Sequence, residues 1–177
     1  MTYVISCSGK KRMPSKENTQ KSSLEKINGF SELYEARKEL IALLGIELNW
    51  NETCPAYKLY DGKIYSKIKP ENWQKKETDV IIVSALFGLI KHNDLLPNYD
   101  VMMTNKIPNN GEIISSFWRN KNINKLISAH TTTDLLFSKY RKAFNIAGSN
   151  VGVLPNIKWK DNYGSHKGEW FNEQLEK

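Results

Sequence analysis

The sequence is poor in the residues that cross-link or anchor a chain. Its 177 residues include only two cysteines, Cys7 and Cys54, without a CxxC spacing, which excludes a disulfide-stabilised scaffold. The longest apolar run, VIIVSALFGLI at residues 80–90, is much shorter than the roughly 20 residues of a membrane span. Met1 leads directly into TYVISC, without the charged and apolar regions of a signal peptide. We therefore expect a cytoplasmic protein.

Several nucleotide and hydrolase fingerprints are also missing. The sequence has no GxxxxGK[ST], no GxGxxG after its first predicted strand and no GxSxG. These absences argue against a P-loop, a dinucleotide-binding fold and an α/β-hydrolase elbow. His130, Asp134 and His166 could hold a metal, but zinc ligands normally cluster in the sequence, so we expect neither a metal nor a cofactor.

What the sequence does have is positive charge. Its 26 Lys and Arg against 19 Asp and Glu give a net charge of +7 and a pI near 9.3, in a chain whose hydrophobic share of 40% is typical of a globular protein. Basic residues concentrate in segments 10–26, 58–76 and 119–142, whereas segment 30–53 is acidic. This pattern favours a phosphate-bearing partner or an anionic surface, although a basic soluble protein without such a partner has the same net charge.

Hydrophobic periodicity predicts one α/β domain over residues 1–177, with a mostly parallel central sheet flanked by helices. Segment 29–45 is the clearest helix, with Ser31 as a candidate N-cap, Arg37 on its otherwise apolar face and Gly45 at the C′ position. Segment 79–86 is continuously apolar, as in a strand covered on both faces. The aromatic residues of segment 155–177 indicate that it packs back onto the domain. The other predicted elements are strands at 2–7, 123–130 and 148–155 and helices at 111–120 and 131–144.

A first candidate site follows the first predicted strand. The loop SCSGKKR, residues 6–12, contains a hydroxyl residue, a glycine and three consecutive cations. Backbone N–H groups around such a glycine can form an anion-binding concavity, and a solvated lysine turn is an equally good interpretation. The candidate anion-binding residues are Ser8, Gly9, Lys10, Lys11 and Arg12. Cys7 could be an activated thiol, but a small buried residue at a strand end is the stronger interpretation.

A second candidate site follows the apolar strand at 79–86. Gly88 permits a sharp change of direction, and Asp94, Tyr99 and Asp100 lie beyond it. Because ligands of open α/β sheets bind at the carboxyl ends of the strands, we expect these side chains and the cationic loop to face one crevice. Alternatively, Asp94 caps a turn and Asp100 pairs with a lysine.

The segment VSALFGLIKHNDLLPNYDVMM, residues 83–103, resembles the YaaA family of bacterial proteins, also called DUF328 or UPF0246, or a shorter related α/β domain. The family pattern is a small residue, an aromatic, Gly-Leu-Leu/Ile, then Asp-Leu, then Pro-Tyr and a Met; here one residue separates Pro97 from Tyr99. ISCSGKK, DGKIYSKI and ISAHTTTDLLFSKY resemble further family segments in the same order. The resemblance implies DNA binding in a basic cleft and a role in peroxide stress.

These observations lead to two main hypotheses of function, and to a weaker third one, an enzyme of nucleotides or sugar phosphates. In the first, a metal-independent DNA glycosylase extrudes a base into the crevice, where Asp94 or Asp100 stabilises the cationic sugar or activates water. Tyr99 would stack on the base or hydrogen-bond to it, Lys10 would contact a phosphate, and Tyr65 is a further candidate nucleic-acid-binding residue expected near them. In the second, a stress or defence protein binds double- or single-stranded DNA without catalysis. The cations that would contact phosphates are Lys10, Lys11, Arg12, Lys139, Arg141 and Lys142.

Overall fold

Four strands form the central sheet of the computed structural model, which describes residues 2–75, 79–128, 131–144, 151–158 and 163–177. The strand order is β4-β3-β1-β6, with bounds β1 Thr2–Ser6, β3 Asp79–Ser84, β4 Gly88–Lys91 and β6 Thr132–Asp134. β1 pairs in parallel with β3 and with β6, whereas β3 and β4 form an antiparallel hairpin. The predicted mostly parallel α/β sheet is therefore confirmed. A smaller antiparallel sheet joins β2, Thr53–Pro55, to β5, Leu95–Pro97.

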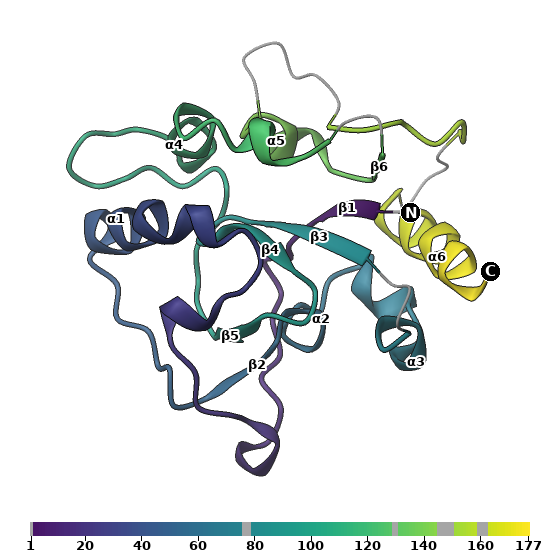
Figure 1. Ribbon diagram of the computed structural model, residues 1–177, viewed down its shortest axis with the longest axis horizontal. Helices are drawn as coiled ribbons and strands as arrows, with labels where there is room; N and C mark the ends of the chain where they lie inside the picture. The colour runs from purple at the N-terminus through teal and green to yellow at the C-terminus, as the bar shows by residue number, and fades with distance from the viewer. Residues whose placement is uncertain (1, 76–78, 129–130, 145–150, 159–162) are drawn as a thin grey trace.

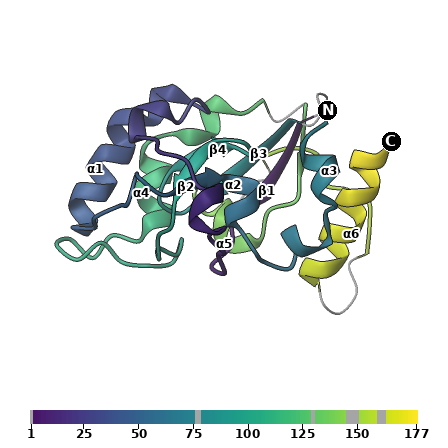
Figure 2. The same ribbon diagram turned by 90° about the horizontal axis from the view of Figure 1, so that it is seen from below.

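Six α-helices surround these sheets in the described part of the chain. They are α1 Tyr34–Leu44, α2 Ala56–Leu59, α3 Pro70–Trp73, α4 Ile114–Asn120, α5 Ser138–Arg141 and α6 Tyr163–Glu176. Figures 1 and 2 show α1 and α4 at one end of the molecule and α3 and α6 at the other. Short 3-10 turns connect them at Lys16–Asn18, Leu24–Lys26, Ser31–Leu33, Tyr65–Lys67 and Ile123–Leu126.

The β3–β4 hairpin forms the centre of the core. All residues of β3 after Asp79 are buried, as its unbroken apolar sequence predicts. Gly88 begins β4 with φ +68°, a conformation that other residues adopt only with strain. A Cβ atom at this position would also lie 2.8 Å from the Trp118 ring, so the predicted sharp turn requires glycine here.

The predicted helix at 29–45 is present but starts later than expected. Ser31 lies in a 3-10 turn and does not cap α1, which begins at Tyr34. Gly45 ends α1 in the left-handed conformation, with φ +62°, as predicted. Arg37 is completely buried in the face that α1 turns toward the sheet. A charged side chain on the core face of a helix requires compensating polar partners, and these are found at the β3–β4 hairpin.

Two predictions for the second half of the chain are wrong. The predicted strand at 123–130 begins as the 3-10 turn Ile123–Leu126, and the predicted helix at 131–144 begins as strand β6. The β-branched threonines at 131–133 fit an extended strand beside β1 better than the first turn of a helix. Only α5 remains of the predicted helix. The predicted strand at 148–155 lies partly outside the described residues, and within it Val153 forms a single parallel bridge to Thr133.

The C-terminal segment packs onto the domain, as its aromatic content indicates. Phe171 of α6 is fully buried, and its ring centre lies 4.9 Å from that of Tyr3 in β1. Gly168 lets α6 approach closely, because a Cβ atom there would lie 2.5 Å from the Ile64 carbonyl oxygen. Among the described residues, no helix combines the length and the apolarity needed to cross a membrane.

Candidate functional site

The cationic loop that follows β1 is held against the segment after α2. The Arg12 backbone N–H donates to the Leu59 carbonyl over 2.8 Å, and the Asp61 N–H donates to the Lys10 carbonyl over 2.9 Å. Gly62 allows this approach, since a Cβ atom there would lie 2.4 Å from the Ser8 hydroxyl oxygen. The Ser8 hydroxyl also accepts the Lys10 N–H over 3.1 Å, which fixes the start of the loop. Gly9 is exposed.

A cluster of buried tyrosine hydroxyls lies at the carboxyl ends of β1 and β3. The Tyr99 hydroxyl is 2.6 Å from that of Tyr60 and 2.9 Å from that of Ser84, the last residue of β3. Tyr65 donates to the carbonyl of Ser6, the last residue of β1, over 2.9 Å. Burial raises the pKa of Tyr60, Tyr65 and Tyr99 well above the usual value. These phenols are therefore neutral at physiological pH and act as hydrogen-bond donors and acceptors.

Lys11 brings the cationic loop to the second predicted site. Its ammonium nitrogen lies 4.2 Å from the centre of the Tyr99 ring and 5.9 Å from that of Tyr60, in cation–π geometry. Burial lowers the pKa of Lys11, and the nearby Cys7 and Asp100 oppose this shift. The structure therefore brings Lys11 to the Tyr99 ring, although Tyr99 is buried and none of Lys11, Tyr99 and Asp100 lines the aromatic hollow described next.

An aromatic hollow of about 320 Å³ opens next to this cluster. Trp73 forms its wall, stacked between Tyr57 at 5.5 Å and Tyr65 at 5.9 Å, with interplanar angles of 21° and 12°. Arg12 and Lys58 contribute positive charge to its lining. The lining residues are Arg12, Tyr57, Lys58, Tyr60, Asp61, Tyr65, Ser66, Ile68, Pro70, Trp73 and Gln74. Flat rings and cations around a small hollow suit a planar ligand that carries a phosphate.

Asp61 is the carboxylate of the aromatic hollow. One of its oxygens lies 2.9 Å from the Lys10 ammonium nitrogen and 3.1 Å from the Arg12 guanidinium. The hydrogen bond from Lys10, followed by the charge of Arg12, lowers the pKa of Asp61. Both cations are mostly exposed, so Asp61 gathers two cations that can still contact an anionic partner.

The cations of α5 divide into two kinds. The Tyr140 hydroxyl donates to the Cys7 carbonyl over 3.2 Å, which brings α5 to the same sheet edge as the cationic loop. Lys139 and Lys142 are exposed and able to contact a partner. Arg141 instead forms two hydrogen bonds of 2.9 and 3.1 Å with the buried carboxylate of Asp134. Arg141 therefore stabilises the end of β6 in this structure.

Asp94 lies apart from the other predicted catalytic residues. In the β3–β4 hairpin Ser84 is opposite Gly88 and Ile81 is opposite Lys91, so Asp94 follows the far end of β4. Three residues of strand, about 10 Å, separate these two ends. The Asp94 carboxylate accepts backbone N–H groups from Asn28, Gly29 and Lys91 at 2.8–3.2 Å. Asp94 therefore links the loop of Asn28 and Gly29 to the turn that follows Lys91. This structural role resembles the alternative interpretation, in which Asp94 caps a turn.

The weak candidate metal site can be followed only in part. His130 is outside the described residues, and Asp134 is occupied by Arg141 and by the backbone N–H groups of Leu136 and Val151. Within the described ranges, no three His, Cys, Asp or Glu side chains gather where they could hold a metal ion.

Sequence reasoning missed most of the aromatic hollow. Of its lining, only Arg12 and Tyr65 were candidates from the sequence. A signal was available in the segment YKLYDGKIYSKIKPENW at residues 57–73, where aromatic and basic residues alternate as they do in surfaces that bind unpaired bases. Without helical or strand periodicity, however, the segment gave no indication of which rings share a face.

Comparison with known proteins agrees with the resemblance of the segments quoted above. A family model described as "Peroxide stress protein YaaA" matches residues 1–167. A UPF0246 protein of Streptococcus uberis is 29% identical over 116 residues, which cover 62% of this chain and 47% of that protein. UPF0246 proteins of Streptococcus equi subsp. zooepidemicus and Flavobacterium johnsoniae are 28% and 25% identical over 83% and 85% of this chain, and over 63% and 72% of their own lengths. The chain thus spans about half to two thirds of the length of the relatives that it matches first.

Proposed function

The chain belongs to the family of the peroxide stress protein YaaA, and we propose that it binds nucleic acid by taking one unstacked base into the aromatic hollow. The observation that carries this proposal is the partly exposed Tyr57 ring, which is stacked on the buried Trp73 in a hollow lined by Arg12 and Lys58. Stacking on an aromatic side chain contributes about 1–3 kcal/mol per base and tolerates every base. The two cations would contact the phosphates on either side of that base.

Positive charge near the aromatic hollow supports the same partner. Lys10 and Arg12 share Asp61, and Lys139 of α5 and Lys142, which follows α5, are exposed at the sheet edge that the cationic loop also occupies. Such a surface suits single-stranded DNA, or a duplex with an extruded base, because both present phosphates next to an unpaired ring. Base stacking and phosphate contacts are sufficient for a stress or defence protein that binds DNA without catalysis.

A metal-independent N-glycosidase is the second candidate, because an ionised carboxylate lines the same hollow. In this reaction the bond from the anomeric carbon to the base breaks while a carboxylate stabilises the cationic sugar that forms, water then adds to the anomeric carbon, and the proton that water releases ends on the departing base. Asp61 is the carboxylate of the aromatic hollow, and Asp100 is an exposed carboxylate whose charge acts on Lys11. Asp94 has no part in this proposal, because its oxygens hold three backbone N–H groups elsewhere.

Binding is tested by fluorescence anisotropy with a labelled single-stranded oligonucleotide and with duplexes that contain or lack a mismatch. Tyr57→Leu should weaken binding by about tenfold, because it removes a stacking ring. Arg12→Gln should remove one phosphate contact and so lower the slope of log affinity against log salt concentration by about one. Lys38→Gln is the matched control, since Lys38 is exposed on α1 beside Glu35. Equal affinity of Tyr57→Leu and the unchanged protein would rule out the aromatic hollow as the binding site.

Catalysis is tested separately, by searching incubated DNA for alkali-labile abasic sites. If the chain is a glycosidase, Asp61→Asn should abolish such sites while it preserves or increases DNA affinity, because Lys10 and Arg12 lose their carboxylate partner. DNA binding without any abasic sites would leave the non-catalytic protein as the function. Binding of mononucleotides that does not strengthen with oligonucleotide length would instead favour a nucleotide or sugar-phosphate enzyme.

A further inference from the structure

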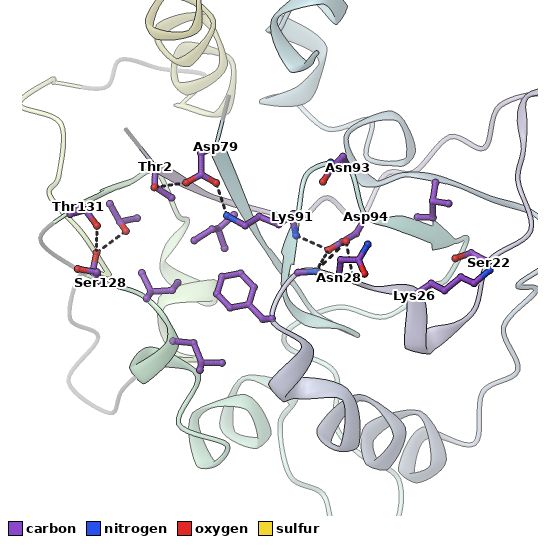
Figure 3. A pocket seen from close by; sticks show the side chains of 17 residues that line it. Thr2, Ser22, Lys26, Asn28, Asp79, Lys91, Asn93, Asp94, Ser128 and Thr131 are labelled. Carbon is purple, nitrogen blue, oxygen red and sulfur yellow. Dashed lines mark hydrogen bonds and ion pairs between the residues drawn. The ribbon is translucent and has the colours of Figure 1, made fainter. Parts of the chain in front are cut away.

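A second cavity, of about 710 Å³, lies at the opposite edge of the sheet, where β1 and β3 begin. Figure 3 shows Ser128 and Thr131 on one side of it and Asn28 and Asp94 on the other, with the ion pair of Lys91 and Asp79 between them. The apolar part of its wall comes from Phe30, Ile81, Leu95, Leu126 and Ile127. A cavity of this size and mixed lining is large enough for a small molecule, and the aromatic hollow has no residue in common with it.

Two buried charged side chains fix the loop at Gly29, which lines this cavity: Asp94, which also lines it, and Arg37, which lies behind the loop. Arg37, which is fully buried, donates to the Gly29 carbonyl over 2.6 Å and also to the Phe87 and Leu89 carbonyls. Asp94 accepts the N–H of the same Gly29 over 3.2 Å. A Cβ atom on Gly29 would lie 2.5 Å from an Asp94 oxygen, so no side chain fits at this position. The loop is therefore fixed on both sides of Gly29.

The residue after Gly29 has a strained backbone. Phe30 has φ +55° and ψ +61°, a left-handed conformation that is uncommon for an aromatic residue and costs on the order of 1–3 kcal/mol. In this conformation its ring lines the cavity, with the Lys91 ammonium nitrogen 5.8 Å from the ring centre. A glycine would remove the backbone strain, so the sequence retains an aromatic ring in the cavity at a cost in stability.

The charges deep in the cavity are already compensated. Lys91 forms an ion pair of 2.5 Å with Asp79, whose other oxygen accepts the Thr2 hydroxyl over 2.6 Å. Asp94 is satisfied by three backbone N–H groups. Hydrogen-bonding capacity remains on the exposed side chains of Asn28, Asn93 and Lys26 and on the buried Ser22 hydroxyl, which make no side-chain hydrogen bond or ion pair within the described part of the chain. Amides and hydroxyls both donate and accept, which matches the hydroxyl groups of a ligand.

We propose that this cavity binds a neutral, hydroxyl-rich ring, namely a sugar ring, either as a free monosaccharide or as the ribose of a nucleoside. Its C–H face would pack on Phe30, and its hydroxyl groups would exchange hydrogen bonds with Asn28 and Asn93. This inference does not depend on nucleic-acid binding in the aromatic hollow.

The test is two-dimensional NMR of ¹⁵N-labelled protein titrated with D-ribose, D-glucose and adenosine to about 50 mM for the sugars, a range suited to weak ligands. We expect saturable shifts of the Gly29 backbone amide and of the Asn28 and Asn93 side-chain amides. Phe30→Gly should weaken this binding by at least about tenfold, and Asn93→Ala should weaken it as well. Asn98→Ala is the control, because Asn98 is exposed and lines neither hollow. Phe30→Gly should remain folded, because it relieves the left-handed strain.

The outcomes separate this proposal from the proposed function. Tighter binding of adenosine than of D-ribose, lost in Phe30→Gly, identifies the nucleoside as the source of the ring, and equal binding identifies the free sugar. The absence of saturable shifts at Gly29 with all three probes overturns the proposal, as does unchanged binding in Phe30→Gly. If adenosine shifts only residues of the aromatic hollow, Tyr57→Leu removes those shifts and neither free sugar shifts Gly29, the sugar cavity is refuted while base binding is supported.

Discussion

The ammonium nitrogen of Lys11 lies 4.2 Å from the centre of the Tyr99 ring, so two loops that are far apart in the sequence meet at one edge of the sheet. Lys11 follows β1 and Tyr99 follows β5, and the antiparallel bridge of Lys11 to Tyr60 places a second phenol beside them. The cationic loop therefore meets the segment of Tyr99, but the expected common crevice is not shown, because Tyr99 is buried and the aromatic hollow is lined by neither Lys11 nor Tyr99. Asp94 does not take part in this contact, because it lies at the opposite edge of the sheet.

Asp94→Asn and Asp100→Asn should separate structural from functional carboxylates. An asparagine at position 94 would turn an NH₂ group toward backbone N–H donors, so we expect a loss of about 1–3 kcal/mol in the free energy of unfolding. Asp100 is exposed, and its substitution should change stability by less than about 0.5 kcal/mol. Urea denaturation of the two variants gives the comparison. Equal stability of both variants would contradict the fastening role of Asp94.

Arg37→Met should be among the most damaging substitutions in α1. It leaves the Phe87, Gly29 and Leu89 carbonyls buried without their donor, which should lower the free energy of unfolding by about 3–5 kcal/mol. Arg37→Lys should rescue only part of the loss, because one ammonium group cannot reproduce the planar fork of the guanidinium. Lys38→Met, at an exposed neighbouring position, is the control in the same denaturation series. A stability loss no larger than that of the control would count against this role of Arg37.

Lys167 should make stability depend on pH in the alkaline range. Burial, together with the charge of Arg141, lowers the pKa of Lys167 to about 8, whereas the unfolded chain keeps this proton to about pH 10. Between about pH 8 and pH 10 the unfolded chain binds more protons at this lysine than the folded chain does. The free energy of unfolding should therefore rise with pH over this range, by about 1–3 kcal/mol in total. The measurement is the difference in unfolding free energy between the unchanged protein and Lys167→Met, in which the tyrosine contributions cancel. Parallel pH profiles of the two proteins would refute the prediction.

Cys54 should react with thiol reagents only when the chain unfolds. It is fully buried, and burial raises its pKa to about 11, so very little thiolate is present at neutral pH. In Cys7→Ser, which leaves Cys54 as the single thiol, labelling by a chromogenic disulfide should follow the rate of global unfolding. Rapid labelling of the native Cys7→Ser protein would show that Cys54 is accessible.

The fold was predictable wherever local pattern and tertiary environment agree. Segment 80–83 is apolar throughout and forms the buried centre of β3, and Gly45 ends α1 where a C′ glycine is expected. Segment 131–144 was mispredicted because Thr131 and Thr132 also suit a helix N-terminus, and pairing with β1 decided for a strand. The candidate site was half predictable. Lys11 and Tyr99 follow strand ends, whereas Trp73 joins the aromatic hollow through the packing of a segment without periodicity.

By itself the sequence determined the α/β class, the central apolar strand, the basic character and the resemblance to the YaaA family, because each depends on residue type and on local spacing. Only the tertiary structure decided that Asp94 and Arg37 both form hydrogen bonds with Gly29. It also decided that Asp61 forms ion pairs with Lys10 and Arg12. The stacking of Trp73 with Tyr57 and Tyr65 was likewise decided there. The physical reason is that a carboxylate or a ring has several equally good partners along the chain, and the close packing of the folded state selects among them.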